Sequence, residues 1–314
     1  MTSPTPRQWL LGLAFATVYG VWGTTYYAIA IALRTLPPFA SGSIRFLLAA
    51  GLMYLLLRAR GARPLAGIDW RGAVLAGVLL TGVGNGFVLW GQQTVPSGIA
   101  ALLVAALPLW ILLFDTVAFA RRRPQTKDFI GSLIGLAGVA LIVAQTRSFD
   151  GSGSFFPTLM ILLAEVAWAI GTLVQRGSVR PGQLGAFACA QMLVGAVFQT
   201  LCALLLGEWP QVALEDFTTP TVLAVAYLSV FGSVVAFNAY LWLVTQVALP
   251  AVATYSLVNP VIALGLGAAL LGEPLSWSAV LACLLVLAGV ALVLVRLPLR
   301  PPARNLGRDC ESTT

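Results

Sequence analysis

The sequence predicts an all-α polytopic membrane protein made of two similar halves. Hydrophobic residues make up 59% of its 314 residues and charged residues only 9%, so a water-soluble fold could not bury its apolar surface. The same apolar pattern also occurs twice, because at an offset of 152 residues Leu89-Trp90 matches Leu241-Trp242 and Pro108 matches Pro260. A repeat of this length indicates two copies of one structural unit.

Ten apolar segments are long enough to cross a bilayer, which takes about 20 helical residues for about 30 Å of hydrocarbon. The first segment is too long for a signal peptide, whose apolar core has about 7–15 residues. Breaks such as Pro37-Pro38 and Gly151-Ser-Gly153 separate the segments. In order, the predicted helices are 8–32, 38–58, 70–93, 97–120, 128–146, 156–176, 183–206, 219–243, 250–271 and 277–297. They form one repeat over 8–146 and another over 156–297, followed by a tail over 298–314.

The distribution of basic residues predicts the orientation of these helices. Because each repeat has an odd number of helices, the second inserts upside down relative to the first. Fifteen of the 18 Lys and Arg residues fall in segments on one side of the predicted bundle. The other side has only Arg34 and Arg147, with Arg45 just inside a helix. An excess of Lys and Arg marks the cytoplasmic side of a membrane protein. Both termini are therefore predicted to be cytoplasmic. The orientation of the helices in the lipid bilayer accounts for the net charge of +7, so no nucleic-acid partner is expected. The basic side carries Arg7, Arg58, Arg60, Arg63, Arg71, Arg121, Arg122, Arg123, Lys127, Arg176, Arg180, Arg296, Arg300, Arg304 and Arg308.

Composition argues against an enzyme and against a bound metal or cofactor. His is absent, and the four Cys residues have neither paired nor metal-ligand spacing, so no metal site, cofactor or disulfide is expected. A catalytic carboxylate pair would need Asp115 beside Glu165, but the predicted topology places them at different depths. Gly82-Val-Gly84-Asn85-Gly86 has the wrong spacing for a nucleotide-binding fingerprint.

Glu165 lies near the middle of the sixth predicted helix. Trp168 and Thr172 follow at i+3 and i+7, so the three side chains share one helical face. An acidic residue inside a membrane is costly unless it finds a partner or water. Two interpretations stay open. In a solvated cavity Glu165 binds a substrate ammonium group or a proton, and in a packed interior it pairs with a neighbouring helix.

Aromatic and amide side chains supply further candidates. An aromatic stripe on the first helix ends in Trp22 and Tyr26, and it predicts either an interhelical seam or a pocket wall. Arg34 and Arg45 either attract a carboxylate or anchor the interface, and the amides either contact substrate or tie helices together. The predicted substrate-binding residues are Trp22, Tyr26, Asn85, Gln92, Glu165, Trp168, Asn238, Tyr255 and Asn259.

Proline and glycine mark the places where helices bend or pack closely. Pro108 and Pro260 cancel a backbone hydrogen bond at equivalent places in the two repeats, and they predict hinges or, alternatively, static bends. The glycines around Gly84 permit close packing or a local break that exposes backbone groups. A small-residue face at Gly131, Gly135 and Gly138 mediates internal packing or a dimer.

Matching segments in the two repeats resemble a known family. Ser97-Gly-Ile-Ala-Ala-Leu-Leu-Val-Ala-Ala-Leu-Pro108 and Ala251-Val-Ala-Thr-Tyr-Ser-Leu-Val-Asn-Pro260, with Leu271-Gly-Glu273-Pro, resemble the paired EamA domains of the drug/metabolite transporter superfamily. Trp22-Gly23 and Arg45 match the usual beginning of the first domain. The resemblance covers about residues 8–297, and its most similar branch is the YddG-like exporters of aromatic and other amino acids.

One residue of the family pattern occurs in only one repeat. Glu273 follows the Pro-containing helix of the second repeat, whereas the equivalent stretch of the first reads Ala120-Arg-Arg-Arg123. Whatever Glu273 does therefore has no symmetric counterpart. We expect it to cap or pair at a helix end.

The resemblance implies a secondary transporter of the bacterial inner (plasma) membrane that exports amino acids and related metabolites by alternating access. A small-molecule ligand with an ammonium group, a carboxylate and an apolar side chain would use Glu165, arginine or amide groups, and the aromatic walls. An exporter of hydrophobic or cationic drugs and a channel-like facilitator are the alternatives. The substrate range, the direction of transport, proton coupling, the most stable conformation and the choice between monomer and homodimer stay open.

Overall fold

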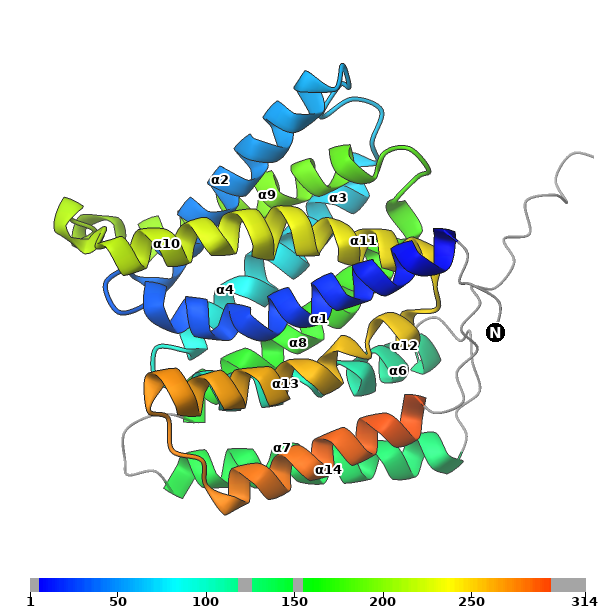
Figure 1. Ribbon diagram of the computed structural model, residues 1–314, viewed down its shortest axis with the longest axis vertical. Coiled ribbons are helices and arrows are strands. Elements are labelled where there is room, and N and C mark those ends of the chain that lie inside the picture. Colours follow the sequence, from blue (N-terminus) through cyan, green and yellow to red (C-terminus); the bar gives the residue numbers. More distant parts are fainter. Residues whose placement is uncertain (1–5, 118–125, 149–154, 295–314) are drawn as a thin grey trace, which may run out of the picture.

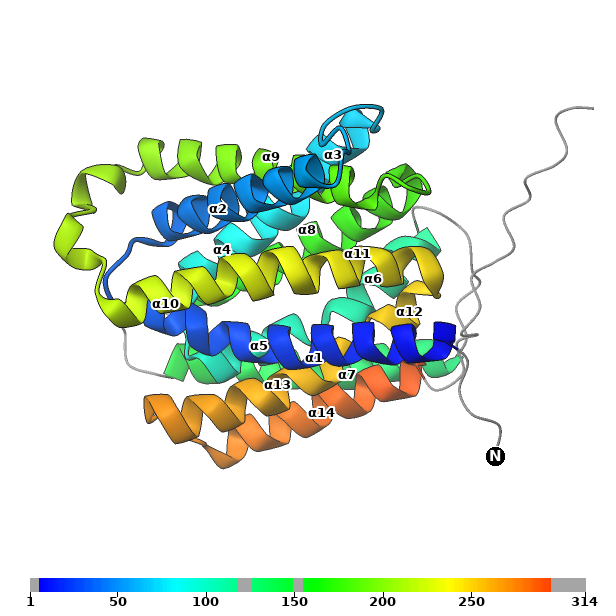
Figure 2. The same cartoon turned by 45° about the horizontal axis from the view of Figure 1, so that its top comes forward.

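The computed structural model describes residues 6–117, 126–148 and 155–294, and every regular element in these ranges is a helix. Most of the helices lie side by side and run along a similar direction, whereas α2 (Pro38–Ala59) runs obliquely to them in Figure 1, and Figure 2 shows the same helices from another angle. The predicted all-α fold is confirmed. The tail 298–314 and the basic residues Arg121–Arg123 lie outside the described residues.

The described residues form ten helical segments, each of which falls on one of the predicted ranges. Some segments contain a π-helical stretch or a short interruption, and two 3-10 turns, η2 (Trp209–Gln211) and η3 (Leu214–Asp216), lie in the loop after α9. The segments are α1 (Pro6–Ala32), α2 (Pro38–Ala59), α3–η1–α4 (Trp70–Ala76, Gly77–Gly84, Asn85–Gly91), α5 and α6 (Ser97–Val104, Leu107–Val117), α7 (Thr126–Ser148), α8 (Phe155–Ser178), α9 (Leu184–Leu205), α10–η4–α11 (Thr219–Tyr227, Leu228–Val235, Ala236–Gln246), α12, α13 and η5 (Leu249–Val252, Tyr255–Leu266, Gly267–Leu271) and α14 (Trp277–Leu294).

Five described helices are both long enough and apolar enough to cross a membrane. They are α2, the continuous helix Trp70–Gly91, α8, α9 and the continuous helix Thr219–Gln246. Each carries large exposed side chains such as Leu55 and Leu223, as expected for helices that face lipid.

Helices at equivalent positions in the two repeats pack against each other. The second helix of the first repeat, α2, packs along the second helix of the second, α9. In the same way the fifth helices of the two repeats pack together, since α7 lies along α14 at the lower edge of Figure 1. The two repeats therefore interlock through like helices.

Glycine allows the close approach of α7 and α14. A Cβ atom on Gly138 would lie 2.8 Å from the Val286 side chain, and one on Gly289 would overlap the backbone of Gly131 and Gly135. The small-residue face predicted at Gly131, Gly135 and Gly138 thus serves internal packing. Gly138 and Gly289 occupy the same place in the repeated sequence Leu-Ala-Gly-Val-Ala-Leu.

Two π-helical stretches occur at equivalent positions of the repeats. The first, η1 (Gly77–Gly84), interrupts the third helix, and the second, η4 (Leu228–Val235), begins 151 positions later in the eighth. A π-helix carries an extra residue per turn and therefore frees backbone groups for side-chain partners. The Asn85 amide donates to the carbonyl of Leu80 at 3.0 Å, and the Ser233 hydroxyl donates to that of Leu228 at 3.0 Å.

The fourth and ninth segments are interrupted ahead of their prolines. The chain leaves α5 at Ala105 and starts α6 at Leu107, so Pro108 lies in the first turn of a new helix, where its missing N–H costs nothing. In the second repeat the interruption separates Val252 from Tyr255, and Pro260 lies inside α13. A hinge role for the two prolines stays a prediction.

Two carboxylates cap helix N-termini at one end of the molecule. This end, called the Glu208 end here, is where residues 33–37, 92–96, 206–218 and 272–276 connect the helices. Glu208 accepts from the backbone N–H of Ala40 in α2 at 2.7 Å. Glu273 accepts from Ser97 and Gly98 at the start of α5, at 2.7 and 3.1 Å, which confirms the expected cap.

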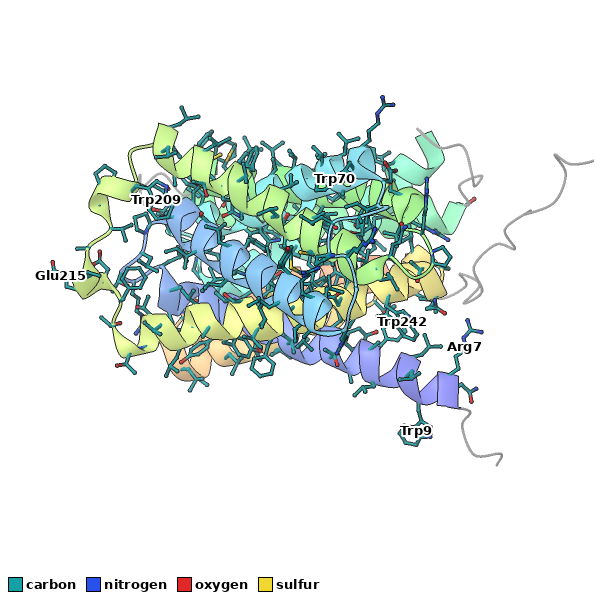
Figure 3. All side chains as sticks on the ribbon, turned by 90° about the horizontal axis from the view of Figure 1, so that it is seen from above. Arg7, Trp9, Trp70, Trp209, Glu215 and Trp242 are labelled. Atoms are coloured by element: carbon teal, nitrogen blue, oxygen red, sulfur yellow. The ribbon has the colours of Figure 1, made fainter. Side chains whose placement is uncertain are left out.

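The burial of Glu208 sets it apart from an ordinary surface carboxylate. Its side chain is 6% exposed. Burial raises the pKa of its carboxyl above the usual range, against the lowering effect of the backbone N–H groups of Ala40 and Phe39. Each cap joins two helices that occupy the same position in the two repeats. Glu208 follows α9 and accepts from α2, the second helices of the two repeats. Glu273 follows η5 and accepts from α5, which belong to the fourth segments of the two repeats. Figure 3 shows Glu215 at the Glu208 end and Arg7 at the opposite end.

Candidate functional site

A cavity of about 60 Å³ lies between the two repeats. The first repeat lines it with α1, α2, the junction of η1 with α4, and α5. The second repeat lines it with α8, α11 and α13. Membrane transporters built from two repeats place their substrate site at this kind of interface.

Most of the predicted site residues meet at this cavity. The seven that line it are Trp22, Tyr26, Asn85, Glu165, Trp168, Tyr255 and Asn259. The other two, Gln92 and Asn238, do not line it. Gln92 is buried at the end of α4, and the Asn238 amide instead donates to the carbonyl of Val234 at 2.6 Å.

The aromatic residues form one wall built around Trp22. Its ring packs edge-on against Trp168 and Tyr255, with centroids 5.7 and 5.1 Å apart, and lies tilted at 5.0 Å from Tyr240. These are the offset and edge-to-face geometries that aromatic pairs favour. The indole N–H of Trp22 donates to the carbonyl of Gly232 in η4 at 3.1 Å. The stripe on the first helix is thus both a packing seam and a pocket wall.

Glu165 extends from α8 into the cavity and is 2% exposed. Its Oε2 atom has no hydrogen-bond partner within the described part of the chain. Tyr26 and Tyr255 line the same cavity, and the Tyr240 ring packs edge-on against Tyr255 with centroids 6.0 Å apart. Thr172, on the same face of α8, shares a 2.7 Å hydrogen bond with the Tyr240 hydroxyl. The carboxyl therefore lies among aromatic residues, and no ion pair with another described residue holds it.

Arg45 also lines the cavity, and the structure separates it from Arg34. Arg34 is exposed, whereas Arg45 is only 4% exposed. Arg45 donates through Nε to the Ser233 hydroxyl at 2.9 Å and through Nη1 to Asn85 Oδ1 at 3.4 Å. Its guanidinium lies 4.8 Å from the centre of the Phe46 ring, which is a cation–π geometry. The burial of Arg45 could not be predicted from its place early in the second helix, because the depth of its side chain depends on how α2 packs on η4.

Asn259 and the glycines shape the remaining walls. With its amide nitrogen oriented to donate, Asn259 reaches the carbonyls of Tyr19 and Tyr255 at 3.3 and 3.2 Å, so it ties α1 to α13 at the cavity edge. A Cβ atom on Gly84 would lie 2.9 Å from the Trp168 ring. The glycine-rich stretch therefore provides both a local π-helical break and close packing.

Comparison with known proteins identifies the family. Residues 8–144 and 156–295 match the EamA-like transporter family. The chain belongs to this family. It is a multi-pass membrane transporter of the drug/metabolite transporter superfamily, as the two repeats and the apolar helices also indicate.

Relatives of this transporter share most of its length. It is 36% identical to the uncharacterized inner membrane transporter YedA of Escherichia coli, over 96% of this chain and 97% of YedA. It is 25% identical to a probable amino-acid metabolite efflux pump of Salmonella typhimurium, over 94% of this chain and 98% of that protein. A solved crystal structure with a TM-score of 0.67 and 22% identity covers 91% of this chain and 96% of its own, and shows the same fold.

The volume of the transporter's cavity and the side chains around it limit what the cavity holds in this conformation. A volume of about 60 Å³ accommodates a few water molecules, whereas pockets for organic ligands have about 300–1,000 Å³. The walls must therefore move apart before an organic ligand enters. No group of three or more His, Cys, Asp or Glu side chains that could hold a metal occurs among the described residues.

Proposed function

We propose that the protein exports amino acids, aromatic and other neutral ones, and related metabolites across the inner membrane by alternating access. The observation that carries this proposal is the buried carboxyl of Glu165, whose Oε2 atom has no hydrogen-bond partner among the described residues and which faces a cavity that both repeats line with aromatic side chains. A buried carboxylate without a partner is costly. A substrate ammonium group would supply the missing charge, and the aromatic wall would receive an apolar side chain.

In this proposal ten helices cross the membrane and both termini lie in the cytoplasm, so the Glu208 end faces outward. The carboxylate caps hold α2 and α5 to the ends of their repeat equivalents at this end. The small cavity and the caps support a contracted conformation, closed toward the outside. Opening would pull the capped helices apart, with Pro108 and Pro260 beside the interruptions that allow the helices to bend.

A hydrophobic or cationic drug is the second candidate cargo. The observation that favours it is the same carboxyl beside Trp22, Trp168 and Tyr255, since aromatic faces attract organic cations. Such a cargo would not need a carboxylate. A channel-like facilitator would need a continuous path, and it would show neither saturation nor counterflow.

Counterflow in proteoliposomes tests the proposal. Vesicles loaded with unlabelled Phe, Met or Thr are expected to accumulate the labelled amino acid through the wild type in a saturable way. Glu165→Gln removes the counter-charge for the ammonium group, so we expect counterflow to fall by at least about 30-fold, as for the loss of one partner of a buried charge pair. Glu215→Gln changes an exposed acid in the loop and serves as the matched control.

Each outcome of this experiment decides between the candidates. Saturable amino-acid counterflow that Glu165→Gln abolishes and Glu215→Gln preserves supports the proposal. Counterflow that survives in Glu165→Gln would return this residue to a packing role. No amino-acid counterflow from well-folded protein, together with counterflow of a lipophilic cation, would favour the drug exporter.

A further inference from the structure

We propose that Arg45 recognises a carboxylate on the transported molecule, so that the cavity selects zwitterions by their two opposite charges. The carboxylate would bind at Arg45 and the ammonium group at Glu165. This inference rests on the proposed function and deepens it, because it adds a requirement that a cationic drug would not meet. Four observations carry it: the free donors of Arg45, the lack of an ion pair with Glu165, the glycine that packs beside the guanidinium, and the contrast with Arg34.

The hydrogen bonds of Arg45 leave part of its guanidinium free. Ser233 and Asn85 accept from Nε and Nη1, and Nη2 has no partner among the residues that the structure describes. A guanidinium has five N–H donors in a planar fork that matches the two oxygens of a carboxylate. The bonds to Ser233 and Asn85, with the contact to the Phe46 ring, fix the plane of the fork. The group is thus oriented but not saturated.

Arg45 and Glu165 line the same cavity without pairing. No ion pair within 4.0 Å joins these two described side chains, although both are at most 4% exposed. If two opposite buried charges served only stability, a direct ion pair between them would offset most of the free-energy cost of their burial. Held apart in one cavity, each instead lacks the partner that the opposite end of an amino acid provides.

The backbone of η4 packs closely against the guanidinium without a side chain in between. Gly232 lies next to it, and a Cβ atom there would come within 3.2 Å of Nη2 and 3.3 Å of the Thr25 methyl group. Thr25 also lines the cavity. A side chain at this position would therefore press on the guanidinium and on a cavity wall, and glycine avoids this.

Burial argues against an anchoring role for Arg45. An arginine that anchors a helix at the membrane surface keeps its charged head in water, as the exposed Arg34 does. Arg45 instead carries its charge into the interior, between η4 of one repeat and α4 of the other. A charge placed there at such a cost is expected to have a partner during the transport cycle.

Three ligands that share a phenyl ring test the ammonium group and the carboxylate separately. L-phenylalanine carries both charges, phenylethylamine only the ammonium group, and phenylpropionate only the carboxylate. Binding of each radiolabelled ligand is measured with purified protein in lipid nanodiscs, for the wild type, Arg45→Gln, Glu165→Gln and the exposed-arginine control Arg34→Gln. Arg45→Lys is added because it keeps the charge but loses the fork.

We expect Arg45→Gln to weaken L-phenylalanine and phenylpropionate binding by at least about 30-fold and to change phenylethylamine binding by less than about threefold. Glu165→Gln is expected to weaken L-phenylalanine and phenylethylamine instead. Arg34→Gln should bind all three ligands like the wild type, and Arg45→Lys should lie between the wild type and Arg45→Gln for L-phenylalanine. Retained phenylethylamine binding also shows that Arg45→Gln is folded.

Other results would overturn the inference. If Arg45→Gln, or Arg45→Lys where the glutamine variant does not fold, binds L-phenylalanine like the wild type, Arg45 does not recognise the carboxylate. An equal loss of all three ligands would give it a purely structural role. Wild-type protein that binds neither L-phenylalanine nor phenylpropionate also excludes a carboxylate site.

The same measurements distinguish a failure of the proposed function. If the wild type shows no amino-acid counterflow but binds phenylpropionate in an Arg45-dependent way, the amino-acid cargo is wrong while the role of Arg45 stands. If the wild type transports phenylalanine and Arg45→Gln does so equally well, the cargo stands and the role of Arg45 falls.

Discussion

The absence of a side chain at Gly84 determines the position of the Trp168 ring. A Cβ atom at this residue would lie 2.9 Å from Trp168 and 3.0 Å from the carbonyl oxygen of Leu79. The ring can turn away, but the backbone carbonyl has little freedom to move. The aromatic wall and the π-helical break therefore depend on each other through one residue.

We expect Gly84→Ala to lower the free energy of unfolding by about 1–3 kcal/mol, since overpacking a close contact costs this much. It should also reduce phenylalanine counterflow by displacing Trp168 into the cavity. Thermal unfolding in detergent and counterflow in vesicles measure the two effects. Gly51→Ala is the matched control, because Gly51 lies inside α2 with no neighbouring atom within 4 Å.

The control should be neutral or stabilising by up to about 1 kcal/mol, the difference in helix propensity between Ala and Gly. A Gly84→Ala variant that is as stable and as active as Gly51→Ala would show that the contact with Trp168 has no role in positioning the ring.

At the scale of the helix, Glu273 stabilises the start of α5. Its carboxylate accepts from two backbone N–H groups that have no partner within the helix. We expect Glu273→Ala to destabilise the protein by about 0.5–2 kcal/mol, the range measured for lost N-terminal caps. Thermal unfolding in detergent checks this, with the exposed Glu215→Ala as control.

Equal melting temperatures for Glu273→Ala, Glu215→Ala and the wild type would contradict the cap. A loss much larger than the expected range would mean that Glu273 also holds η5, whose Gly267 lies directly beneath the carboxylate.

The sequence predicts the helices well, because an apolar run bounded by Pro, Gly or Arg defines a helix wherever the surroundings are apolar. All ten predicted ranges fall on helices, and the boundaries differ by a few residues. The same reasoning does not give the three π-helical stretches η1, η4 and η5 or the interruption before Leu107. These features depend on contacts with neighbouring helices, such as that of Gly82 with Phe198.

The candidate site is less predictable than the helices. Glu165 was identifiable because an acid in an apolar helix stands out, and Trp22 and Tyr26 because they share a stripe. The sequence predicts a substrate contact for the Asn238 amide, yet its neighbour Phe237 lines the cavity instead. The π-helical turn just before it changes which face of α11 points inward, and no local sequence rule contains that rotation.

At the scale of the whole molecule, the predicted topology makes the two ends of the bundle chemically distinguishable from outside the cell. Glu215 and Arg180 are both exposed, in loops that the prediction places on opposite sides. In a background without native Cys residues, a membrane-impermeant maleimide added to intact cells should label Glu215→Cys. Arg180→Cys should react only after the membrane is permeabilised.

The four native Cys residues must be replaced first, and Cys202 in particular, because it is partly accessible near the Glu208 end. Labelling of Arg180→Cys in intact cells, with Glu215→Cys protected, would reverse the orientation. Labelling of both positions would mean that the two loops share one side, which ten membrane-crossing helices do not allow.

The two π-helical stretches have a consequence for how this sequence tolerates insertions and deletions. Each acts as an extra residue in the reading of helix faces, because one residue turns an α-helix by about 100°. Deleting one residue within Gly77–Gly84 would restore ordinary α-helical spacing and leave the side chains from Asn85 to Gly91 on their present faces. The same applies to Ala236–Gln246 beyond η4. Both copies carry the extra residue at matching places, so a single deletion here shortens the helix but keeps the same residues facing the cavity, whereas a single deletion in the α-helical part would turn every side chain beyond it by about 100°.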